Sequence, residues 1–98
     1  MEIIHLENAK EFEKLVKEDK ILIDFFATWC GPCKMLGPVL ERVESKLKVV
    51  KVDTDKFEDL ARTYGVMSIP TLVLLENGNE VKRNIGFIDK NSLEKWLK

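Results

Sequence analysis

Two cysteines separated by two residues are the side chains of this chain with the clearest chemistry. Cys30 and Cys33 are the only cysteines among 98 residues, and they enclose Gly31 and Pro32 directly after Trp29. An apolar run ends just before them, and helical spacing of apolar residues begins just after. Residues three apart in the first turn of a helix face the same way, and their Cα atoms fit the separation of about 4.4–6.8 Å that a disulfide requires. The spacing therefore predicts two thiols that can close into a disulfide and reopen.

A helix that begins at this pair would make one of the sulfurs reactive. The first turn carries unpaired N–H groups and the positive end of the helix dipole, and both favour a thiolate over a thiol. We therefore expect Cys30 to ionise more readily than an ordinary cysteine. Pro32 suits the first turn, because its missing N–H would be unpaired there in any case. A disulfide across so short a loop constrains the unfolded chain by only about 2 kcal/mol, which suits a switch better than a structural crosslink.

One acidic residue interrupts the apolar run before the cysteines. Asp24 stands in the middle of 21–27, which is otherwise nearly all apolar, as a strand buried on both faces should be. A buried carboxylate is costly unless it is protonated or paired. The residue is either a functional acid or a tolerated one. Lys51, inside the next predicted strand, is either its partner or a lysine whose amino group reaches solvent at a strand edge.

The spacing of apolar residues predicts strands that alternate with amphipathic helices. The predicted strands are 3–6, 21–27, 49–53, 71–75 and 80–85, and the predicted helices are 10–18, 35–47, the segment that ends at Gly65 and the segment that follows Asp89. The pairs Asn8–Glu11 and Asp55–Glu58 have the pattern of helix N-caps, and Asp89 is expected to cap the last helix. Asn77-Gly78 is typical of a hairpin turn. This order predicts parallel crossovers followed by one antiparallel hairpin, in a mixed sheet with helices on both faces.

Length and composition limit the classes of protein to consider. A chain of 98 residues predicts a single domain over 1–98, with the methionines and Trp96 in its core. Its 16 basic and 17 acidic residues are spread along the chain, without the basic patch of a nucleic-acid-binding protein. No run approaches the roughly 20 apolar residues of a membrane span, and the first residues lack the pattern of a secretory signal. We therefore expect a cytoplasmic monomer without nucleic-acid or membrane partners.

Several separated motifs together resemble the thioredoxin family. They are, in order, Asp24, Trp29-Cys30-Gly31-Pro32-Cys33-Lys34, Pro38, Lys51-Val52-Asp53, Ile69-Pro70-Thr71, Asn77-Gly78 and Gly86. The resemblance covers essentially the whole chain and implies a three-layer α/β/α fold around a central mixed sheet of four to five strands. It also implies a protein-disulfide reductase that carries electrons, is re-reduced by thioredoxin reductase and needs no cofactor beyond the Cys30–Cys33 disulfide. Two positions depart from the family pattern, because Phe26 is often tryptophan and Gly37 is commonly alanine.

The resemblance also implies roles for individual residues. The cysteine matching Cys30 is the exposed nucleophile that attacks a disulfide in a partner protein, and the one matching Cys33 is the buried thiol that resolves the mixed disulfide. The family's aspartate matching Asp24 is a general base that acts through a water, and Lys51 would offset part of its burial cost. Pro70 matches a cis-proline that faces the cysteines. The implied substrate-binding residues are Trp29, Gly31, Pro32, Ile69, Pro70, Ile85 and Gly86.

Other interpretations of the cysteine pair stay open at this point. A structural zinc site usually has four protein ligands, and apart from the two cysteines the chain offers one distant histidine, His5, so we expect no metal. Inert buried thiols are a second possibility. Among functions, a domain that donates disulfides as an oxidase or isomerase is the alternative within the same chemistry. A binding subunit that does not use redox chemistry is the alternative outside it.

Overall fold

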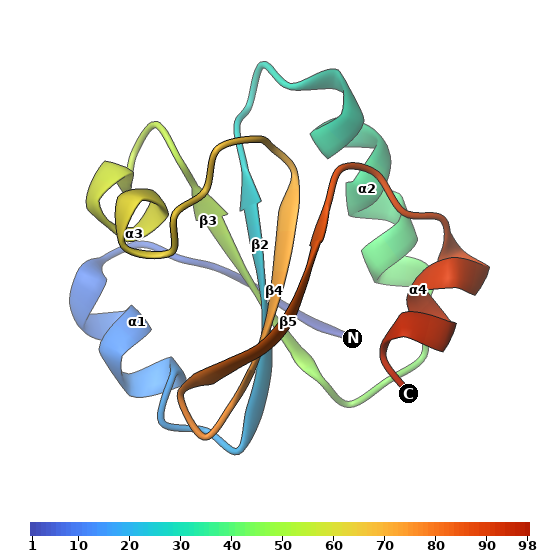
Figure 1. The fold of residues 1–98 in the computed structure, drawn as a ribbon, viewed down its shortest axis with the longest axis horizontal. Helices are drawn as coiled ribbons and strands as arrows, with labels where there is room; N and C mark the ends of the chain where they lie inside the picture. The colour runs from blue at the N-terminus through green and yellow to red at the C-terminus, as the bar shows by residue number, and fades with distance from the viewer.

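The computed structural model describes residues 1–98 as a five-stranded sheet flanked by four helices (Figure 1). The elements are β1 Glu2–His5, α1 Ala9–Leu15, β2 Lys20–Phe26, α2 Gly31–Arg42, β3 Lys48–Asp53, α3 Glu58–Thr63, β4 Thr71–Glu76, β5 Asn79–Ile85 and α4 Lys90–Trp96. The order of strands and helices is the one that the sequence predicts. The longest helix, α2, has 12 residues, and no helix qualifies as a candidate membrane span.

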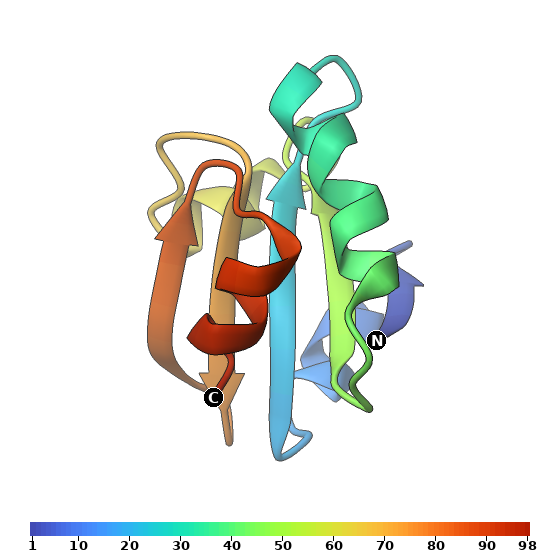
Figure 2. The same ribbon diagram turned by 90° about the vertical axis from the view of Figure 1, so that its right-hand side faces the viewer.

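Helices cover both faces of the sheet, as predicted. The helices α1 and α3 lie over one face, and α2 and α4 lie over the other (Figures 1 and 2). Strand β2 lies in the middle of the sheet and sends Ile23 and Phe25 into the first layer and Leu22 into the second. Because all three side chains are completely buried, β2 needs apolar residues on both of its faces. This explains the apolar run in the sequence, and it makes Asp24, the one acidic residue within that run, conspicuous.

The sheet contains one more antiparallel pairing than the sequence predicts. Its strand order is β1-β3-β2-β4-β5, with β1 and β2 parallel to β3, whereas β4 is antiparallel to both β2 and β5. The cause is the short helix α3, whose six residues rise only about 9 Å and cannot carry the chain along the length of a strand. The chain therefore enters β4 at the end of the sheet where it left β3. Thr71, the first residue of β4, is paired with Phe25 near the end of β2.

Two of the predicted helix caps are confirmed and one is wrong. Asn8 and Asp89 each accept a hydrogen bond from the backbone N–H three residues on, at 2.9 and 2.8 Å. Asp55 does not cap α3, which begins after Phe57 without any side-chain cap. Helix α2 ends at Arg42, before the predicted boundary at 47, and α1 ends at Leu15, before 18. The residue at 47 packs against the core from the loop, so the apolar spacing continues beyond the end of the helix.

Substitution of Gly65 tests how the chain leaves α3. This glycine follows the helix with φ of +62°, and an added Cβ would meet no atom within 4 Å. Only the backbone conformation therefore opposes a side chain here. We expect Gly65→Ala to lower the free energy of unfolding by about 1–2 kcal/mol, and Gly65→Asn to lower it less, because asparagine adopts this conformation more readily. Urea unfolding of both variants measures the difference, and equal losses would contradict the explanation.

Candidate active site

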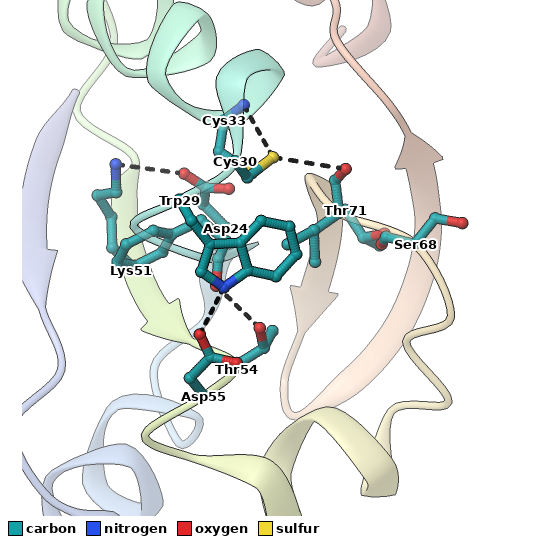
Figure 3. The surroundings of a disulfide bond; sticks show 11 residues. Asp24, Trp29, Cys30, Cys33, Lys51, Thr54, Asp55, Ser68 and Thr71 are labelled. Carbon is teal, nitrogen blue, oxygen red and sulfur yellow. Dashed lines mark hydrogen bonds and ion pairs between the residues drawn. A yellow bond between two sulfur atoms is a disulfide. The ribbon is translucent and has the colours of Figure 1, made fainter.

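The two cysteines lie at the start of α2, as the sequence predicts. Cys30 is the N-cap residue of this helix, and its Sγ accepts a hydrogen bond from the backbone N–H of Cys33 at 3.3 Å (Figure 3). Their Cα atoms are 5.3 Å apart, and the sulfurs form a disulfide. Pro32 lies in the first turn of the helix, where no hydrogen bond needs its missing N–H. The helix terminus thus directs a donor at one sulfur and keeps the other within bonding distance.

The expected difference in exposure between the cysteines is wrong for the disulfide form. Cys30 is 5% exposed and Cys33 is 4% exposed, so neither side chain is freely open to solvent. Ala27 and Ile69 pack against the pair, and the carbonyl oxygen of Ile69 lies 3.8 Å from the Sγ of Cys30. The loop before β4 therefore covers the sulfur that the family resemblance implies to be open. A partner disulfide has to approach across this loop.

The buried acid lies on β2 beside a lysine of β3. Asp24 is paired with Lys51 in the register of the two parallel strands, and the Lys51 Nζ lies 3.6 Å from Asp24 Oδ2. Asp24 is completely buried, and neither of its carboxyl oxygens makes a hydrogen bond within the protein. Burial raises the pKa of Asp24 to about 6, and the positive charge of Lys51 opposes part of that rise. The carboxyl group points toward the cysteine pair (Figure 3).

The surroundings of Lys51 explain how a lysine is accommodated there. Its ammonium group lies 4.7 Å from the centre of the Phe26 ring, a distance suited to a cation–π contact. A Cβ at Gly37 would lie 3.9 Å from the same Nζ, which is ordinary van der Waals contact, so alanine would also fit beside the ammonium group. Both departures from the family pattern, Phe26 and Gly37, therefore lie beside Lys51, and Phe26 also packs against the cluster of Ala27, Cys30 and Cys33.

Three loops at one end of the sheet bring the predicted substrate-binding residues together. Trp29, Gly31 and Pro32 follow β2, Ile69 and Pro70 precede β4, and Ile85 and Gly86 end β5. The Ile69–Pro70 peptide bond is cis, as the resemblance predicts. The N–H of Gly86 donates to the carbonyl oxygen of Pro70 at 2.8 Å, which joins the second loop to the third. Trp29 is 68% exposed and Ile85 is 64% exposed, so the surface around the disulfide is apolar and open.

A shallow groove lies beside Trp29. Its volume is about 250 Å³, and its lining residues are Trp29, Thr54, Ala61, Val66, Met67, Ser68 and Ile69. The indole Nε1 of Trp29 donates a hydrogen bond to Asp55 Oδ2 at 2.8 Å, which fixes the ring at the edge of this groove (Figure 3). The groove contains side chains of the loop before β4 and of α3, so it extends the apolar surface away from the disulfide.

Three residues differ from what the sequence predicts. Asp55, predicted as a helix cap, accepts the hydrogen bond of Trp29. Met67, predicted as a core residue, is 94% exposed, and Met35 is 60% exposed. Met67 lies between the glycine that ends α3 and the Ile69-Pro70 pair, and this loop position is the available signal against burial. Nothing in the sequence indicates that Asp55 reaches the tryptophan.

Comparison with known proteins gives one consistent result. The family model described as Thioredoxin matches residues 3–98. The chain is 46% identical over 92 residues to a thioredoxin of Bacillus subtilis, covering 90% of this chain and 88% of that protein. It is 45% identical over 98 residues to a thioredoxin of Chlamydia trachomatis, covering 97% and 96%. Among solved structures, a mutant thioredoxin from Halobacterium salinarum superposes with a TM-score of 0.90 at 37% identity, covering 97% of this chain and 87% of that one.

Proposed function

This chain belongs to the thioredoxin family of thiol–disulfide oxidoreductases, and from that premise we propose the roles of its residues in the reduction of a protein disulfide. The thiolate of Cys30 attacks one sulfur of the partner disulfide. A bond forms between Cys30 and the partner, the partner's disulfide bond breaks, and the departing sulfur takes a proton. Cys33 then loses its proton and attacks the Cys30 sulfur, which forms the Cys30–Cys33 disulfide and releases the second partner thiol. Two electrons have passed from the dithiol to the partner.

The observation that carries this assignment is the position of Cys30 at the start of α2. The backbone N–H of Cys33 donates to its sulfur at 3.3 Å, and negative charge on that sulfur meets the positive end of the helix. The helix start therefore stabilises a thiolate on Cys30 and holds it beside Cys33. The Cα separation of 5.3 Å lets the second sulfur reach the first without movement of the backbone.

We assign the removal of the Cys33 proton to Asp24. A buried thiol cannot release a proton to solvent directly, and the carboxyl group of Asp24 is the buried acid that points toward it. Its pKa of about 6 lies close to neutral pH, where a general base is most effective. Lys51, at 3.6 Å, keeps that pKa from rising further and so preserves a carboxylate fraction at neutral pH.

The partner binds across the apolar surface around the disulfide. We assign this role to the residues of the three adjacent loops, Trp29, Gly31, Pro32, Ile69, Pro70, Ile85 and Gly86. An extended segment of the partner would pair with the backbone of Ile69, whose carbonyl oxygen lies 3.8 Å from the Cys30 sulfur. Binding through backbone groups and a low apolar surface suits many different proteins.

The partners that follow from this activity are of two kinds. Proteins with accessible disulfides are the substrates, and a thioredoxin reductase returns the Cys30–Cys33 pair to the dithiol form. We propose a cytoplasmic location, because a cysteine pair that must be reduced after each cycle needs a reducing compartment. We also propose that the protein acts as a monomer. Charges of both signs are spread over the chain, which supports neither a nucleic-acid nor a membrane partner.

Equilibration with glutathione tests the direction of the reaction. We expect the Cys30–Cys33 pair to stay oxidised until the buffer is strongly reducing, as in a reductase. Reductases of this kind and disulfide isomerases differ by roughly 90 mV, about a thousandfold in equilibrium constant. The oxidised fraction is measured by alkylating free thiols and weighing the products by mass spectrometry. A pair that is already reduced in mildly reducing buffer would instead indicate an oxidase or isomerase.

A further inference from the structure

Met67 has its side chain almost entirely in solvent beside the reactive disulfide. It is 94% exposed, and it lines the groove of about 250 Å³ together with Trp29 and Ile69. Only Ser68 separates it from Ile69, whose carbonyl oxygen lies 3.8 Å from the Sγ of Cys30. A thioether at this position is open to dissolved oxidants, and it also belongs to the surface that a partner protein would cover.

We propose that Met67 is a site of oxidation by hydroperoxides, and that its sulfoxide weakens the binding of protein disulfides without altering the dithiol chemistry. The sulfur of Met67 attacks the outer oxygen of the peroxide, and the O–O bond breaks. The sulfur gains an oxygen and is oxidised by two electrons, while the peroxide is reduced to water or an alcohol. This inference rests on the proposed function, because it concerns the surface to which substrates bind.

The other sulfur atoms of the chain are less suited to this role. Met35 is 60% exposed, but it lies on α2 and does not line the groove. Met1 is partly buried and packs against the core. Cys30 and Cys33 are at most 5% exposed and have no free thiol while they form the disulfide. Met67 is therefore the sulfur atom that is both open to peroxide and part of the groove.

Oxidation changes what this side chain contributes to binding. Methionine is apolar and flexible, so it adapts to different partner surfaces. A sulfoxide is polar, and covering it without a hydrogen bond costs about 1–3 kcal/mol, equivalent to at least roughly a fivefold loss of affinity. The sulfoxide stands outside the helix terminus that holds the sulfurs, so their reactivity with a small disulfide should not change.

The experiment compares oxidised and untreated protein. The disulfide form, whose cysteines are protected, is treated with hydrogen peroxide, and peptide mapping measures sulfoxide at each methionine. The protein is then reduced with a dithiol, freed of the reagent, and mixed with insulin or with a small aromatic disulfide. We expect the half-saturating insulin concentration to rise at least about fivefold, with an unchanged rate for the small disulfide.

Two variants locate the effect. Met67→Leu keeps an apolar side chain that cannot be oxidised, so its half-saturating insulin concentration should be the same before and after peroxide. Met35→Leu leaves Met67 in place and should respond as the wild type does. The inference is overturned if the wild type with Met67 fully oxidised binds insulin normally, or if Met67→Leu loses as much as the wild type. Failure of the untreated wild type to reduce insulin would instead contradict the proposed function.

Discussion

Replacing Cys30 by serine should lower the rate of insulin reduction to the uncatalysed background. Replacing Cys33 by serine should stop turnover after a single attack. Serine at position 30 keeps the shape of the N-cap but offers a hydroxyl group that does not ionise near neutral pH and cannot form a disulfide. Cys33→Ser leaves the nucleophile and its helix terminus intact. Its Cys30 can attack a partner, but no second thiol releases the product. This variant should therefore accumulate as a covalent mixed disulfide with its substrate.

Two measurements separate these outcomes. Insulin reduction with a dithiol as electron source gives the turnover of each variant, and non-reducing mass spectrometry detects the mixed disulfide. Thermal unfolding of both variants controls for loss of the fold, since the short disulfide contributes only about 2 kcal/mol on the chain-entropy estimate. A mixed disulfide with Cys30→Ser and none with Cys33→Ser would reverse the assigned roles. A binding subunit without redox function would show no activity even in the wild type.

The helices and strands could be predicted from the sequence because their signals are local. Alternation, helical spacing, and the caps Asn8 and Asp89 each depend on residues within a few positions of one another. The antiparallel pairing of β4 with β2 was not predictable in this way, because it depends on how short α3 is. The length of α3 cannot be read from the sequence, because Asp55 has the pattern of an N-cap but instead accepts the hydrogen bond of the Trp29 indole.

Some features of the candidate site could likewise be predicted from the sequence, whereas others could not. The spacing of the cysteines and an acid within an apolar strand were sufficient to predict a reactive pair and a buried carboxyl group, because both signals lie in the sequence itself. The low exposure of Cys30 was not predictable, since it results from Ile69, a residue 39 positions away in the chain that packs over the sulfur. The prediction for Met67 was wrong because it used hydrophobicity alone, which predicts burial, and did not weigh the loop position of this residue between Gly65 and Ile69-Pro70.

The second large effect is expected from Asp24→Asn, which should make the protein more stable and slower. In the folded chain the pKa of Asp24 is raised from 3.8 to about 6, so the folded state holds this proton more tightly than the unfolded state does. Stability is therefore highest below the unfolded pKa and is lost as the pH rises through 3.8 and on through about 6. The loss is about 3 kcal/mol once the group is ionised in both states. Asparagine has nearly the same shape and does not ionise, so it avoids this loss.

Urea unfolding from pH 3 to pH 8 measures the difference. The variant should match the wild type at the acid end, where Asp24 is neutral, and exceed it by up to about 3 kcal/mol above pH 6. Lys51→Met is the companion variant, because removing the ammonium group 3.6 Å from Asp24 should raise the pKa of the carboxyl and extend the loss of stability to higher pH. Curves for wild type and Asp24→Asn that run parallel throughout would show that Asp24 does not titrate in this range.

Measurements of activity test whether the buried Asp24 acts in the reaction. If Asp24 removes the proton from Cys33, then Asp24→Asn should leave the first attack by Cys30 unchanged and slow the release of the mixed disulfide by roughly 100-fold. Stopped-flow measurement of the two steps separates them, and the pH dependence of the second step in the wild type should follow the pKa of about 6. A more stable variant that releases its substrate at the normal rate would make Asp24 a tolerated buried acid. A variant that gains stability and loses only the second step would show that the protein gives up stability to keep a base beside Cys33.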